Sequence, residues 1–112
     1  MLAVILESAD PERLYTGLSL LVSVEQARGL ATFGALHALS RIDADVRGAH
    51  VVASEQEPFA RTLVALRDAA ADRIWACSAA VQATGADPAG LAGVISIPSF
   101  MAEVAGAQIV VV

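Results

Sequence analysis

Five short apolar runs alternate along the chain with segments whose apolar residues recur at helical spacing. The runs predict five strands, at Met1–Leu6, Leu30–Phe33, Arg73–Ala76, Val94–Ile97 and Gln108–Val112. The first is apolar throughout, which is typical of a parallel strand covered on both faces. Because strands and helices alternate, the pattern predicts a three-layer α/β fold with a mostly parallel five-stranded sheet and helices on both faces. With 112 residues, the chain is expected to form a single domain over residues 1–112.

Capping signals mark the predicted helices. Asp10 is placed to cap the first helix, with Pro11 at its first position, and leucines follow at helical spacing until Arg28-Gly29 closes the element. Shorter helices are predicted at residues 34–40, from Cys77 to Gly85, and from Pro98-Ser99 to Gly106.

Residues Arg41–Ser54 have no clear period and are predicted to form a loop or flap, in which His50–Ala53 allows a brief strand. The start of the next helix is ambiguous. Ser54 and Glu57 have the spacing of a capping box, whereas Pro58 at the first helical position places the start later. The two signals exclude each other. The expected buried stripe of this helix is Phe59, Leu63 and Leu66.

The composition changes this picture by predicting self-association. Hydrophobic residues make up 56% of the chain and charged residues 17%, with a mean hydropathy of +0.63, against roughly 25% charged residues in typical domains. No run of about 18 apolar residues escapes a charge or a helix breaker, so we expect no membrane span. A homo-oligomer that hides apolar surface between copies is therefore predicted.

Charge and cysteine content exclude further classes. The net charge is −5, with seven arginines and no lysine, and no basic stripe predicts nucleic-acid binding. The amino terminus has neither a basic region nor a small-residue cleavage site, so we expect no signal peptide. One cysteine cannot form an internal disulfide, which favours the cytosol.

Cys77 is the principal candidate for chemistry. It follows a predicted strand and opens a predicted helix, so it falls at the carboxyl edge of a parallel sheet, where ligands gather. Free N–H groups of Ser78, Ala79 and Ala80 would point toward its sulfur and favour the thiolate. The alternative is structural, because unpaired cysteines are often buried as small hydrophobes. Sequence reasoning leaves both open.

The segment IWACSAAVQATG, a following L-x-G-V strand and a final S-F-M-A-E-V-A-x-A helix and strand resemble the DsrE/DsrF-like family of small sulfur-relay proteins. The resemblance covers the whole chain and is best from Phe59 to Val112, whereas Gly34–Ser54 matches poorly. It implies a compact α/β fold assembled as a trimer or hexamer. It also implies that the cysteine matching Cys77 carries sulfur as a persulfide between donor and acceptor proteins.

A single cysteine fits a persulfide carrier, which needs one thiolate, better than a dithiol oxidoreductase, which needs a resolving cysteine nearby. Three hypotheses follow. The first is a sulfur carrier or sulfurtransferase subunit that uses Cys77 and no cofactor. The second is a non-catalytic oligomeric or small-molecule-binding protein in which Cys77 is structural. The third is a thiol peroxidase or redox sensor.

Other polar residues are weaker candidates. Glu7 and Ser8 follow the first strand and are expected at the same sheet edge as Cys77, where they could contact a partner. His37 is interpreted as structural, while His50 is open between the two roles. Trp75 is predicted to be a buried or interface aromatic. Two histidines and one cysteine have no metal-ligand spacing, and no nucleotide-binding motif is present.

Overall fold

Five parallel strands form one sheet in the order β4-β3-β2-β1-β5. In this computed structural model, which describes residues 1–112, the strands are β1 (Leu2–Leu6), β2 (Ala27–Ala31), β3 (Ile74–Cys77), β4 (Gly93–Ile95) and β5 (Gln108–Val111). The predicted parallel five-stranded sheet is confirmed. No helix has the length and apolar character needed to span a membrane.

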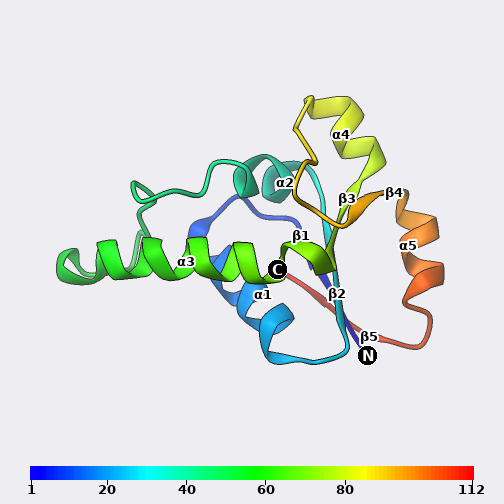
Figure 1. The fold of residues 1–112 in the computed structure, drawn as a ribbon, viewed down its shortest axis with the longest axis horizontal. Helices are drawn as coiled ribbons and strands as arrows, with labels where there is room; N and C mark the ends of the chain where they lie inside the picture. The colour runs from blue at the N-terminus through cyan, green and yellow to red at the C-terminus, as the bar shows by residue number, and fades with distance from the viewer.

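The helices are α1 (Pro11–Ser23), α2 (Phe33–Leu39), α3 (Gln56–Ala70), α4 (Ser78–Thr84) and α5 (Ile97–Glu103), with short 3-10 turns at Ala53–Glu55 and Ala71–Arg73. Figure 1 shows α1 and α3 on one side of the sheet and α5 on the other, with α2 and α4 near the carboxyl ends of the strands. Helices therefore cover both faces, as the alternating pattern predicts.

The first helix begins as expected but ends early. The Asp10 carboxylate accepts a hydrogen bond from the Arg13 backbone N–H at 3.0 Å, and Pro11 is the first helical residue. The helix ends at Ser23, so the predicted end at Arg28-Gly29 is wrong. Gly29 instead lies within β2, where a Cβ atom would stand 3.0 Å from the side chain of Leu21. The glycine allows close packing of strand and helix.

The second strand also begins and ends earlier than predicted, because the helix before it ends at Ser23. The structure places it at Ala27–Ala31, so the prediction of Leu30–Phe33 has the wrong bounds. Phe33 starts α2 and has a positive φ of 26°, which a non-glycine residue rarely adopts.

Neither predicted start of the third helix is correct. The helix begins at Gln56, directly after a 3-10 turn, and Pro58 is its third residue. The side chain of Gln56 donates hydrogen bonds to the carbonyls of Gly48 and Val51 and accepts one from the Gly48 N–H. No strand forms at residues 50–53, because the Val51 carbonyl bonds to the Gln56 side chain and Ala53 already begins the 3-10 turn.

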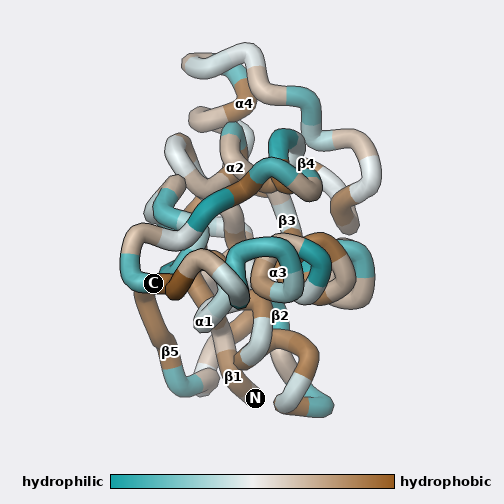
Figure 2. Tube along the Cα trace, turned by 90° about the vertical axis from the view of Figure 1, so that its left-hand side faces the viewer, coloured by the Kyte–Doolittle hydropathy of each residue, from teal (hydrophilic) through white to brown (hydrophobic).

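The core lies mainly between the sheet and the α1–α3 layer. Val4, Leu6 and Ile74 of the strands are buried together with Leu18 and Leu63 of the helices. The expected stripe of α3 is buried in part, because Leu63 is inaccessible while Phe59 and Leu66 are half-buried. Figure 2 shows the apolar character of β1 and of most of β5.

Candidate functional site

Cys77 lies where the sequence pattern places it, but its side chain is enclosed. It is the last residue of β3 and precedes the first turn of α4, so it stands at the carboxyl edge of the sheet. The residue is 1% exposed and belongs to the main hydrophobic cluster. Its side chain makes no capping hydrogen bond with α4, so the amides of residues 78–80 do not donate the expected hydrogen bond to the sulfur. Cys77 occupies a core position in this structure.

Ser78 and Ala79 form the first turn of α4 beside Cys77, as expected. Ser78 is half-buried and Ala79 is exposed. Ala80, the third residue of the turn, is fully buried and packs into the same cluster as Cys77. Ala79 is thus the accessible part of this turn.

Glu7 and Ser8 lie at the same edge but not beside Cys77. Strand β2 lies between β1 and β3, and Leu6 and Ala76 both pair with Ala31. Glu7 is therefore two strand spacings from Cys77, about 10 Å across the sheet. The Ser8 hydroxyl accepts a hydrogen bond from the Asp10 N–H at 3.0 Å. Ser8 therefore shapes the turn into α1.

Thr32, which sequence reasoning missed, occupies the position between them. It follows Ala31, is buried, and its hydroxyl donates to the Leu6 carbonyl at 3.3 Å. Its bond ties the end of β2 to the end of β1. A single threonine before a helix gives no signal that separates this role from ordinary capping.

Beyond the ends of β1 and β2 there is a pocket of about 300 Å³. It lies between the start of α1, helix α2, the loop that follows α2, and Leu63 of α3. Its walls include Pro11, Leu14, His37, Arg41, Val46 and Leu63. His37, interpreted as structural from sequence, is exposed and lines this pocket.

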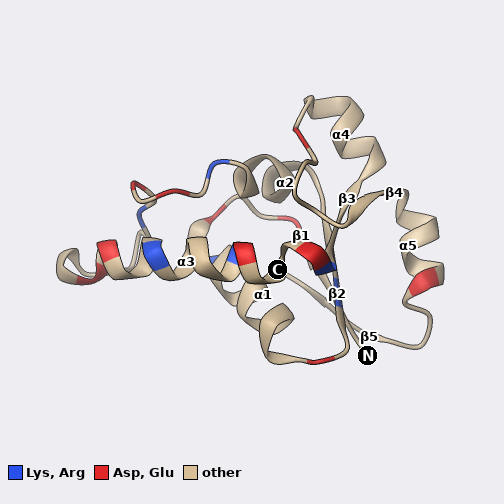
Figure 3. Cartoon of the chain, in the orientation of Figure 1, with Lys and Arg blue, Asp and Glu red and all other residues tan.

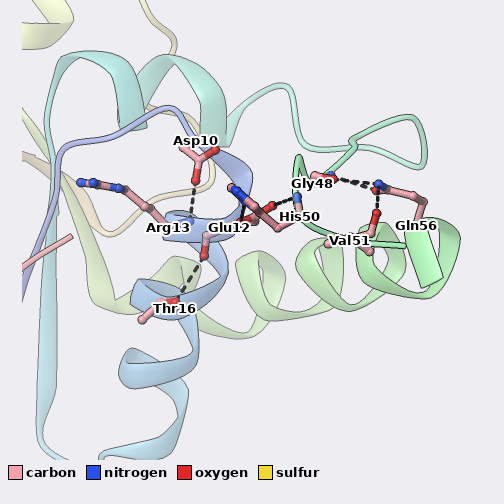
Figure 4. A network of polar contacts seen from close by, with 8 residues as sticks. All are labelled: Asp10, Glu12, Arg13, Thr16, Gly48, His50, Val51 and Gln56. Carbon is pink, nitrogen blue, oxygen red and sulfur yellow. Dashed lines mark hydrogen bonds and ion pairs between the residues drawn. The ribbon is translucent and has the colours of Figure 1, made fainter. Parts of the chain in front are cut away.

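The loop beside this pocket is fastened to α1 by one carboxylate. Glu12 accepts hydrogen bonds from the backbone N–H of His50 at 2.6 Å and from its Nδ1 at 2.9 Å (Figure 4). These bonds lower the pKa of the Glu12 carboxyl below its usual value, the backbone bond contributing most. His50 therefore has a structural contact that fastens the loop to α1. The contact joins residues 38 positions apart, so no local motif could have indicated it.

Trp75 and the potential metal ligands complete the set of candidate residues. Trp75 is half-buried, and its ring lies so close to the Gly93 backbone that a Cβ atom there would stand 2.6 Å from it. The ring therefore packs on the edge strand β4, as expected for a buried or interface aromatic. No group of three His, Cys, Asp or Glu side chains is arranged to hold a metal ion.

No protein-family model matches the chain, and no curated protein is similar to it in sequence.

Proposed function

We propose that this protein is a non-catalytic, self-associating binding protein in which Cys77 fills the core. The burial of Cys77 carries this proposal, because a thiol that exchanges sulfur or electrons with another protein must be reached by it. At 1% exposure and without a hydrogen bond to α4, the side chain behaves as a small hydrophobe.

The distribution of charge supports self-association. After Arg73 only two charged side chains occur, Asp87 and Glu103, and Figure 3 shows how sparsely charged α4, β4, α5 and β5 are. Charged residues are depleted from the centres of protein interfaces.

Exposed hydrophobic side chains occur in the same part of the chain. We call four of them the carboxy-terminal apolar set: Ile97, Met101, Ile109 and Val111. Each is at least 38% exposed. Ile109 and Val111 pair in register with Ala3 and Ile5, so they extend the sheet face opposite α1. That face has one seven-residue helix, α5, to cover it, which leaves apolar surface for another copy.

A pair of matched substitutions tests the assembly. Val111→Glu places a charge in the carboxy-terminal apolar set, whereas Val52→Glu changes a valine of similar exposure in the loop (61% and 65% exposed). By light scattering at micromolar concentration, we expect the unmodified protein to be an oligomer, for which the family resemblance suggests a trimer or a dimer of trimers. Val111→Glu is expected to release monomers and Val52→Glu is not. A monomeric unmodified protein would overturn the proposal.

A second candidate function is sulfur relay through Cys77, which its place at a strand-to-helix junction on the carboxyl edge and the resemblance to the DsrE/DsrF-like family both favour. In that reaction the Cys77 thiolate attacks the outer sulfur of a donor persulfide. An S–S bond forms on Cys77, the donor S–S bond breaks, and the donor leaves as a thiolate. A reducing compartment such as the cytosol would keep the thiol free.

Sulfur relay requires the structure around Cys77 to open, because the residue is 1% exposed. Mass spectrometry after incubation with a sulfur donor tests it directly. A gain of about 32 Da on native Cys77 would show that the residue accepts sulfur, which is the first step of the relay, whereas the structural proposal predicts that the native protein stays unmodified.

A further inference from the structure

The pocket beyond β1 and β2 has an apolar interior. Leu14 of α1 and Leu63 of α3 form its buried wall, and Pro11 and Val46 add apolar surface at the sides. Its volume of about 300 Å³ is at the lower end of the range for small-molecule sites. Ordered water gains little in such a space, because few polar groups face it.

Two nitrogen-bearing side chains that line this pocket, those of His37 and Arg41, have no hydrogen-bond partner within the protein. His37 lies in the last turn of α2 and Arg41 lies in the turn that follows this helix, and both residues line the pocket. Neither the imidazole nor the guanidinium makes an intramolecular hydrogen bond or ion pair. Five of the seven arginines do bond through their guanidinium groups: Arg28, Arg47, Arg61, Arg67 and Arg73.

Two acidic side chains at the start of α1 are already hydrogen-bonded. Asp10 accepts the Arg13 N–H, and Glu12 accepts both hydrogen bonds from His50. Arg13 and Arg41 are the two arginines whose guanidinium groups make no such bond, and of these two Arg41 lines the pocket. Its guanidinium fork suits a carboxylate, which it can bind through two parallel hydrogen bonds.

The backbone beside the pocket is closely packed where α2 begins and β1 ends. A Cβ atom at Gly34 would stand 3.3 Å from the Glu7 carbonyl oxygen and from the Ala9 nitrogen, so the start of α2 presses on the end of β1. Phe33, next to it, is held at a φ of 26°. Such strained positions persist where surrounding structure fixes them, often at binding sites. The place itself, outside the carboxyl ends of parallel strands, is where open α/β sheets bind ligands.

We propose that this pocket binds a small amphipathic carboxylate, with its short apolar body among Leu14, Leu63 and Val46 and its carboxylate on Arg41 and His37. The Glu12–His50 and Gln56–Gly48 contacts hold the loop that carries Val46 before the ligand arrives, which limits the entropy lost on binding. The proposal rests on the binding part of the proposed function and names its ligand class.

Calorimetric titration with octanoate and with octan-1-ol tests the proposal, because the two probes share an apolar chain and differ in the carboxylate. We expect octanoate to bind about 1.5- to fivefold more tightly than the alcohol, as fits one ion pair at an exposed rim. Arg41→Gln should remove this difference. Arg61→Gln, which changes an exposed arginine away from the pocket, should leave it unchanged.

Ala38→Phe supplies the second variant, because Ala38 lines the pocket and a phenyl ring would fill it. We expect this variant to melt as a folded protein and to bind neither probe. Absence of octanoate binding to the unmodified protein, or binding that survives both Arg41→Gln and Ala38→Phe, would overturn the pocket proposal. Equal binding of both probes would reject the carboxylate preference. The self-association and the structural role of Cys77 are judged separately, by light scattering and by alkylation.

Discussion

Replacement of Cys77 by serine and by alanine separates a core cysteine from a helix-capping one. Serine keeps the size of the side chain but buries a hydroxyl, whereas alanine removes the sulfur and leaves a small void. Cys77 is 1% exposed and makes no hydrogen bond to α4. A buried hydroxyl without a partner costs about 1–3 kcal/mol. Loss of one buried heavy atom costs about 1 kcal/mol. Serine should therefore destabilise the protein at least as much as alanine.

Urea denaturation followed by far-UV circular dichroism measures both changes in the free energy of unfolding. The slope of the transition is expected to stay constant, since neither variant alters the surface exposed on unfolding. If the serine variant were as stable as the unmodified protein and more stable than the alanine variant, its hydroxyl would be capping α4. That result would refute the reasoning that the side chain of residue 77 points into the core.

The contact between Glu12 and His50 should depend on pH. Because the pKa of Glu12 is lower in the folded protein than its ordinary value of 4.5, the unfolded chain binds more protons in that range. The stabilisation is present above pH 4.5 and is lost as pH falls through the folded pKa, so the protection factor of the His50 amide (the exchange rate of an unstructured amide at the same pH divided by its own) should fall in acid, and Glu12→Gln should remove most of that change. Gly29→Ala should destabilise the protein by about 1–3 kcal/mol through crowding against Leu21, measured by denaturation. Gly85→Ala, where a Cβ meets open space at a φ of 70°, should cost about 1–2 kcal/mol from backbone strain alone.

The elements that could be predicted from the sequence are those fixed by contacts between residues close together in the chain. Asp10 and Pro11 start a helix through bonds within one turn, so the sequence signal was sufficient. The sequence around Gly29 is compatible with a helix end, because a glycine often follows the last turn of a helix. In the structure Gly29 lies in β2, where the nearby side chain of Leu21 leaves no room for a larger residue.

The candidate site was less predictable because its contacts are distant in sequence. The strand-to-helix position of Cys77 followed from local pattern, but whether its sulfur faces the helix amides or the core depends on the packing of α4. Likewise, nothing near Arg41 indicated a pocket, because Leu14 and Leu63 come from other elements.

Alkylation of Cys77 in the native protein tests the central claim most directly. Iodoacetamide is added to the folded protein at neutral pH and to the same protein in urea, and modification is followed by mass spectrometry. A core cysteine predicts rapid modification in urea and, in the native state, modification only as fast as the protein opens. Rapid alkylation of the native protein, at a rate comparable to that in urea, would contradict the structural role of Cys77 and favour the sulfur relay.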